Sequence, residues 1–143
     1  MFLDASVIVA ILGREAGYEE IEKRLAATTD GAFFVSPLVK FEASVALARR
    51  KALATAPNAR PSPDLLRRAE LAVDAFVEDL GARELSISPE IGKAALDANA
   101  TYGKAVGHVA DLNFGDCFAY ACAKVLGVAL LYKGHDFTHT DLA

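Results

Sequence analysis

The sequence contains no tryptophan, one methionine and only two cysteines among its 143 residues. Two cysteines, Cys117 and Cys122, are too few for a small secreted scaffold held together by disulfides. Their spacing places them about 140° apart around a helix, so they are not expected to pair with each other, and it is not the spacing of a zinc site. We therefore expect two reduced cysteines in the core of a cytosolic protein.

Long apolar runs are also missing. The longest helical ones, such as residues 5–12 (ASVIVAIL), fall far short of the roughly 20 residues that span a bilayer. A signal peptide is not expected, because Asp4 stands where a basic region should be and no small-residue cleavage site follows a long apolar stretch. These absences predict a cytoplasmic location and no membrane association.

The chain has no excess of basic residues, with 15 Lys and Arg against 19 Asp and Glu, a net charge of −4 and a sequence pI of about 5.3. This balance argues against a protein that grips nucleic acid by bulk electrostatics, although contact through bound metal ions remains compatible with it. The phosphate-binding patterns GxxxxGK[ST] and GxGxxG do not occur, so nucleotide-binding enzymes find no support.

Apolar residues are abundant, at 53% of the chain, which supports a packed core and rules out disorder as the main state. The length predicts a single domain over residues 1–143. The pattern predicts short strands at 2–4, 32–35, 84–87 and 128–132, helices at 5–12, 15–28, 37–54, 63–80, 89–101 and 115–126, and loops at 56–63 and 102–114. This alternation indicates an α/β fold with a mostly parallel sheet, and the wholly apolar last strand is expected at its centre.

Four acidic residues map to the edge where the carboxyl ends of parallel strands meet, which is where such folds bind ligands. Asp4 ends the first strand, Glu42 lies one to two turns into the helix after the second, Asp116 opens the apolar helix, and Asp136 follows the last strand. Simpler roles are open to each: Asp4 and Asp116 as helix caps, Asp136 in a turn, and Glu42 on the surface.

Glu42 is the hardest of the four to explain as a surface residue, because it borders a predicted apolar stripe of Leu38, Phe41, Val45 and Ala52. A carboxylate there is partly buried, which is costly unless it is paired. If the four carboxylates approach one another, their repulsion favours uptake of protons or of a cation. Mg²⁺ and Mn²⁺ prefer such oxygen ligands and suit phosphate chemistry.

Several segments, taken in order, resemble one known family. They are the opening strand ending in D-x-S (residues 4–6), FEASVALAR around Glu42, LNFGDCFAYACAK (residues 112–124) and LLYKGHDFTHTDL (residues 130–142). The chain resembles the PIN-domain family over nearly its whole length, and most closely the VapC toxins of bacterial type II toxin–antitoxin modules. The resemblance implies a three-layer α/β/α domain and a metal-dependent endoribonuclease.

The resemblance also assigns roles to particular residues. Asp4 and Asp116 match the principal ligands of Mg²⁺ or Mn²⁺, and Glu42 and Asp136 complete the site directly or through water. Ser6 matches the polar position that orients the first aspartate. His135 stands where many similar chains carry another Asp, which alters the surroundings of the last carboxylate.

Basic residues offer candidate contacts to the RNA backbone. Arg49 and Arg50 belong to one of the two dense basic clusters, and Lys104 and Lys133 lie near the proposed site, although a solvated helix face explains the clusters equally well. The resemblance further implies a hydrophobic groove, built by the first two helices with the third, for a VapB-like antitoxin that places a basic side chain among the carboxylates. A homodimer is also implied.

Two other functions remain as alternatives. One is a PIN-fold protein that binds partners without cutting RNA. The other is a receiver-like signalling domain, since Lys133 follows the last strand. That class needs an acidic pair after the first strand, where Asp4 is followed by Ala5, and an Asp where Ser36 and Ser88 stand, so the residues disfavour it.

Overall fold

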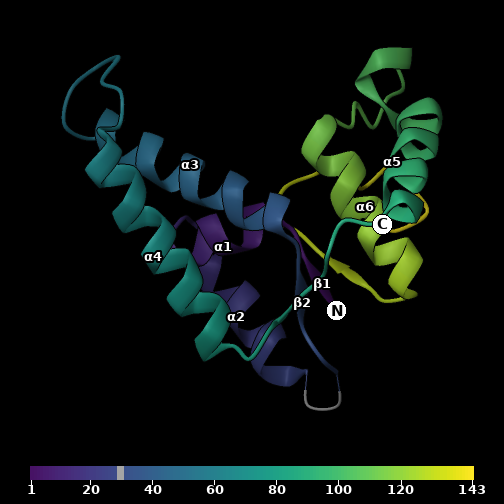
Figure 1. Cartoon of the computed structure of the whole chain (residues 1–143), viewed down its shortest axis with the longest axis horizontal. Coiled ribbons are helices and arrows are strands. Elements are labelled where there is room, and N and C mark those ends of the chain that lie inside the picture. Colours follow the sequence, from purple (N-terminus) through teal and green to yellow (C-terminus); the bar gives the residue numbers. More distant parts are fainter. Residues whose placement is uncertain (29–30) are drawn as a thin grey trace.

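The computed structural model describes residues 1–28 and 31–143, in which a small sheet separates two groups of helices (Figure 1). In chain order the elements are β1 (Phe2–Leu3), α1 (Ala5–Leu12), α2 (Tyr18–Ala27), β2 (Phe34–Val35), α3 (Pro37–Leu53), α4 (Pro63–Asp79), β3 (Arg83–Glu84), α5 (Pro89–Tyr102), the 3-10 turn η1 (Lys104–Val106), α6 (Phe114–Leu126) and β4 (Leu130–Leu131).

All pairings between these strands are parallel, in the order β3-β2-β1-β4. The chain moves from β1 to β2 to β3 in one direction and then returns to β4 on the far side of β1. Because parallel crossovers are right-handed, reversing the direction moves the connecting helices to the opposite face. Figure 1 accordingly shows α1 to α4 on one side of the sheet and α5 with α6 on the other. The predicted three-layer α/β/α fold is confirmed.

Three of the helices begin with the same dipeptide, Ser-Pro. Ser36, Ser62 and Ser88 each accept a hydrogen bond from the main-chain N–H three residues later, and the following proline occupies the first turn of α3, α4 and α5. The missing N–H of proline costs nothing there, and its φ is already helical. These starts explain why the sequence located the three helices well.

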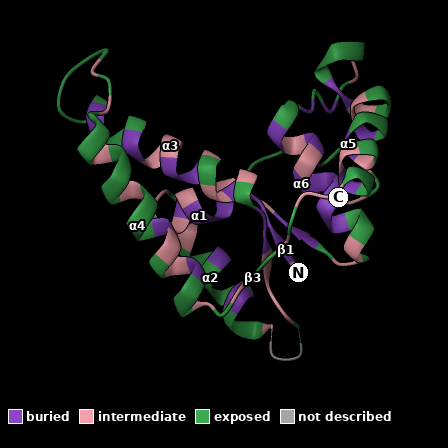
Figure 2. Ribbon diagram, viewed as in Figure 1, coloured by how far each residue is buried: buried purple, intermediate pink, exposed green. Residues whose placement is uncertain are grey.

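The core lies between the sheet and the inner faces of the helices (Figure 2). On α3 the buried positions include Val39, Ala43, Ala48 and Ala52. The predicted stripe was wrong at Phe41, whose side chain is 66% exposed. Small residues on the buried face allow α3 to pack closely on α1 and α4, and the larger aromatic ring is left at the surface.

Two further expectations were wrong. The last strand, β4, lies at an edge of the described sheet, not at its centre. Its apolar composition is nevertheless explained by burial, because Leu130 and Leu131 are both buried and β4 packs against α6. The predicted loop at 102–114 contains η1, a bridge between Gly103 and Leu112, and the start of α6.

Both cysteines are free and buried, as expected. Within the described residues, no helix combines the length and apolar character needed to cross a membrane.

Candidate active site

The predicted acidic residues converge on one cavity at the carboxyl edge of the sheet. This cavity has a volume of about 490 Å³ and is called the acidic hollow here. Its lining comes from the end of β1, from α1 and the turn after it, from α3, from the start of α6 and from the loop after β4. The residues are Asp4, Ala5, Ser6, Val9, Glu15, Glu42, Ala46, Asp116, Lys133, Gly134 and Asp136. All four sequence-predicted carboxylates are among them.

The topology explains why the hollow forms at this place. Strands β1 and β4 are neighbours, yet the helices that follow β1 and precede β4 lie on opposite faces of the sheet. Their carboxyl ends therefore leave a crevice between the two helical layers. Two hydrogen bonds close its floor: the Asp4 N–H donates to the Leu131 carbonyl at 2.9 Å, and the Lys133 N–H donates to Ser6 Oγ at 2.9 Å.

Asp4 caps α1, Asp116 belongs to the capping box of α6, whose N-cap is Asn113, and both aspartates also line the hollow. Asp4 Oδ2 accepts from the Ser6 N–H at 2.9 Å at the start of α1. Asp116 Oδ2 accepts from the Asn113 N–H at 2.8 Å, while Asn113 caps α6 in return. A carboxylate has two oxygens, so a cap made through one oxygen does not exclude a ligand on the other. The capping role of these residues is therefore compatible with the predicted ligand role, which stays a prediction.

Glu42 reaches the hollow across the backbone of α6. Its carboxylate lies where a side chain of Gly115 would begin: a Cβ built there would be 2.0 Å from Glu42 Oε1 and 2.5 Å from Oε2. Glycine is the one residue that leaves this space open. Gly115 thus allows Glu42 to lie next to Asp116, the residue that follows Gly115 in the sequence.

Burial and mutual repulsion shift the acidic groups toward their protonated forms. Burial is the main cause that raises the pKa of Glu42 to about 7, and the charges of Asp4 and Asp116 add to it. Burial likewise raises the pKa of Asp116 to about 6, against a lowering hydrogen bond from Asn113. The pKa of Asp4, which is 7% exposed, is raised by burial and opposed by hydrogen bonds from Ser6. The hollow therefore favours cations or protons.

Asp136 is placed by a short C-terminal loop instead of a helix. The next residue, Phe137, is 1% exposed and packs its ring against Tyr132 at a centroid distance of 4.9 Å. Thr138 and Thr140 close local turns through their N–H groups to His135 and Phe137. A buried anchor thus holds an exposed carboxylate at the rim of the hollow.

The donor set fits a hard divalent cation in its chemistry. Carboxylate oxygens are the ligands that Mg²⁺ and Mn²⁺ prefer, and Mg²⁺ is commonly held by one or two carboxylates with water completing its shell. In residues 1–28 and 31–143, no three Asp, Glu, His or Cys side chains form a group that holds an ion as they stand. The fit therefore lies in the chemistry of the four predicted carboxylates that line the hollow, Asp4, Glu42, Asp116 and Asp136.

Comparisons with known proteins agree with the family resemblance seen in the sequence. The family model described as the PIN domain matches residues 1–142. The chain belongs to the PIN-domain family. A VapC ribonuclease of Rhizobium meliloti (strain 1021) is 55% identical over 141 residues, which cover 99% of this chain and 98% of the relative. Ribonuclease VapC30 of Mycobacterium tuberculosis is 36% identical over 143 residues, covering 100% and 96%.

A solved structure has a similar fold. The crystal structure of Mycobacterium tuberculosis VapC20, titled a sarcin-ricin loop cleaving toxin, aligns with a TM-score of 0.70 at 19% identity and covers 99% of this PIN domain and 95% of that chain. At this identity the likeness concerns the fold.

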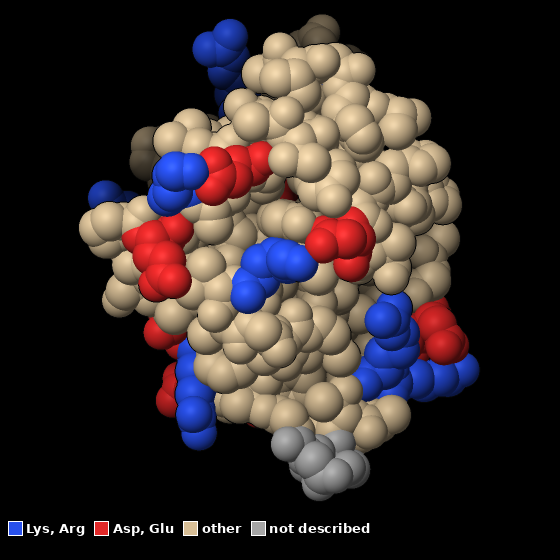
Figure 3. All heavy atoms as spheres, turned by 90° about the vertical axis from the view of Figure 1, so that its right-hand side faces the viewer, with Lys and Arg blue, Asp and Glu red and all other residues tan. Residues whose placement is uncertain are grey.

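The predicted basic contacts of this PIN domain are scattered. Lys133 lines the acidic hollow. Arg50 lies just outside it and pairs with Glu15. Lys104 lies at a different cavity, between α5 and α6, and Arg49 lies at another near the end of α3. Figure 3 shows one face on which positive and negative side chains are interspersed, without a broad basic patch.

Sequence reasoning missed two acidic residues with defined partners. Glu15 lines the hollow and binds Lys133, which is 118 residues away in sequence, so no local pattern indicates the pair. Asp141 accepts hydrogen bonds from Tyr120 Oη at 2.6 Å and Lys124 Nζ at 2.8 Å. These bonds tie the end of the chain to α6.

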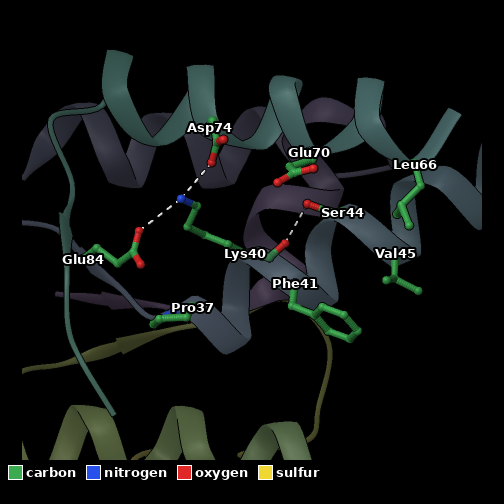
Figure 4. A pocket seen from close by; sticks show the side chains of 9 residues that line it. All are labelled: Pro37, Lys40, Phe41, Ser44, Val45, Leu66, Glu70, Asp74 and Glu84. Carbon is green, nitrogen blue, oxygen red and sulfur yellow. Dashed lines mark hydrogen bonds and ion pairs between the residues drawn. The ribbon is translucent and has the colours of Figure 1, made fainter. Parts of the chain in front are cut away.

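A separate cavity of about 400 Å³ lies between α3 and α4 (Figure 4). Lys40 from α3 forms ion pairs there with Asp74 of α4 at 2.7 Å and Glu84 of β3 at 3.0 Å. The hydrogen bond to Asp74 is the main cause that raises the pKa of Lys40, and the bond to Glu84 adds to it, so the ammonium stays charged. This cluster links three elements and lies outside the acidic hollow.

Proposed function

We propose that this chain is the toxin of a VapBC-like type II toxin–antitoxin module, an endoribonuclease that hydrolyses RNA phosphodiester bonds with Mg²⁺ or Mn²⁺. The observation that carries the proposal is the convergence of Asp4, Glu42, Asp116 and Asp136 on one hollow at the carboxyl edge of the sheet. Membership of the PIN-domain family and full-length similarity to VapC ribonucleases support the reaction class.

Asp4 and Asp116 would be the principal ligands of the cation. A bound divalent ion would polarise the phosphate, lower the pKa of water and stabilise the leaving oxygen. Ser6 and Asn113 orient the two aspartates through their main-chain N–H groups. Glu42, with a pKa near 7, binds or releases a proton at its carboxylate oxygens close to neutral pH.

The antitoxin would occupy an apolar groove that is linked to the hollow by the ion pair of Arg50 with Glu15. A cavity of about 410 Å³ lies between α1, α3 and α4, floored by Leu12, Leu47 and Leu65. Arg50 and Lys51 line it as well, and Arg50 also contacts the Gly13 carbonyl beside Glu15. The groove therefore suits an apolar segment with acidic residues. This proposed groove is built by α1, α3 and α4, whereas the resemblance implied one built by the first two helices with the third. A homodimer remains part of the proposal by resemblance to the family.

The test is cleavage of a mixed RNA pool by purified, antitoxin-free protein with Mg²⁺, with Mn²⁺ and with EDTA. Asp4→Asn is expected to abolish cleavage. Asp97→Asn is the matched control, because Asp97 is exposed on α5 and pairs only with Lys93 among the described ion pairs. Cleavage by Asp4→Asn at the wild-type rate would refute the assignment. Folded wild-type protein that binds Mn²⁺ without cutting any RNA would favour the binding-only alternative.

A further inference from the structure

The rim of the acidic hollow carries an ion-pair network that does not include the four predicted carboxylates, which are called the quartet here. Lys133 Nζ donates to Glu15 Oε2 at 2.5 Å, and Arg50 pairs with Glu15 Oε1. Arg50 also donates to the Gly13 carbonyl at 3.2 Å. Each oxygen of Glu15 thus faces a cation. Glu15 is therefore placed as a counter-ion to Lys133 and Arg50, although it lines the same hollow as the four predicted ligands.

Both partners are anchored through their main chains. The Lys133 N–H donates to Ser6 Oγ at 2.9 Å, and the Glu15 N–H donates to the Ala10 carbonyl at 2.9 Å. Their side chains are 30% and 28% exposed, so water screens the pair less than it screens a fully exposed one. The geometry fixes where the Lys133 ammonium lies relative to the hollow.

Among the described residues that line the hollow, one side chain is cationic, Lys133, and five are acidic. A lysine ends in a compact charge on a flexible four-carbon stem. Carboxylates such as Asp4 and Asp136 attract that charge into the hollow, where it would neutralise them and compete with a divalent cation. The pair with Glu15 opposes this movement.

We infer that Glu15 is a positioning residue that holds the Lys133 ammonium at the rim of the acidic hollow. In this position Lys133 leaves the carboxylates open to a divalent cation and presents its charge to a phosphate group of the RNA backbone. The inference rests on the proposed ribonuclease function and extends it to residues outside the quartet.

The test measures Mn²⁺ affinity by calorimetry, without RNA, for the wild type, Glu15→Gln, Lys133→Met and the double variant. Releasing Lys133 in Glu15→Gln is expected to weaken Mn²⁺ binding by about two- to fivefold, the range of one partly screened ion pair. Removing Lys133 as well should restore the affinity to that of Lys133→Met, because the competing ammonium is gone.

RNA cleavage gives the second readout. Glu15→Gln and Lys133→Met are each expected to raise KM for RNA, and the double variant should show no further rise. Asp64→Asn is the matched control, because it takes a carboxylate from an ion pair with Arg68 on the exposed part of α4. Thermal unfolding of every variant checks that the fold is kept.

Each outcome has a definite meaning. Equal loss of Mn²⁺ affinity in Glu15→Gln and in the double variant would overturn the inference, because Glu15 would then act on the cation directly. Wild-type affinity in all variants would overturn it too. Wild-type protein that neither binds Mn²⁺ nor cuts RNA overturns the proposed function and the inference with it, whereas active wild type with additive variants overturns the inference alone.

Discussion

Replacing Gly115 by alanine tests how Glu42 is brought into the acidic hollow. The new Cβ would lie 2.0 Å from Glu42 Oε1, whereas an ordinary contact begins at 3.4 Å, so the carboxylate has to retreat by more than 1 Å. The carboxylate ends a flexible side chain, so the backbone can stay in place. Gly115 is the second residue of α6 and does not have a positive φ, so its backbone accepts alanine and α6 should not be destabilised.

A shift of about 1 Å at a reacting centre can cost on the order of 100-fold in rate. We expect Gly115→Ala to cut RNA about 10- to 100-fold more slowly under single-turnover conditions, and to bind Mn²⁺ more weakly in calorimetry. Its thermal midpoint should equal or exceed that of the wild type. Gly92→Ala is the matched control, since Gly92 also lies in a helix and an added Cβ there meets nothing within 4 Å.

A double-mutant cycle shows whether the effect passes through Glu42. In a Glu42→Gln background the carboxylate charge is already lost, so Gly115→Ala should cost little more. Unchanged cleavage and Mn²⁺ affinity in Gly115→Ala would refute the reasoning. A large extra loss in the Glu42→Gln background would refute it as well, because the glycine would then act by another route.

Three further predictions concern pH, the chain end and the loop anchor. The pKa of Glu42 is raised to about 7, so the folded protein holds a proton there that the unfolded chain loses near pH 4.5. The stability that this proton gives the metal-free protein is therefore present below pH 4.5 and is lost as the pH rises through 7. The thermal midpoint in EDTA should fall over that range, and the fall should be smaller in Glu42→Gln. Asp141→Asn should lower the midpoint without changing Mn²⁺ affinity or kcat/KM, because the side-chain partners of Asp141 within residues 1–28 and 31–143 are Tyr120 and Lys124, which lie outside the hollow. Altered Mn²⁺ affinity would contradict this. Phe137→Ala should cost about 3–5 kcal/mol in denaturant unfolding, and a cost near zero would contradict the anchor.

The sequence predicted the architecture because the local signals were strong. Ser-Pro starts, glycine stops such as Gly81 and Gly127, and apolar strands all act over a few residues. The four acidic residues could be placed for a related reason: Asp4 and Asp136 follow strands, Asp116 lies in the first turn of a helix and Glu42 lies in the second turn of another, and parallel topology sends these points to one edge. Their role as a metal site stays a prediction.

Features that depend on tertiary packing could not be predicted from the sequence. The position of β4 at the edge depends on which strand pairs with β1, and the exposure of Phe41 depends on how closely α3 approaches its neighbours. The pair of Glu15 with Lys133 joins residues that no periodicity connects. The need for glycine at position 115 arises only once Glu42 lies across it.

The C-terminal loop around Asp136 tolerates substitution better than the surroundings of the other three carboxylates. Asp4, Glu42 and Asp116 lie in or cap helices, so substitutions around them disturb the core. Around Asp136 only Phe137 is buried, and His135, Thr138 and His139 are exposed. Variation in these exposed residues leaves the fold untouched while it changes the surface beside the hollow. Divergence in substrate choice among related chains is therefore expected to accumulate in this loop first.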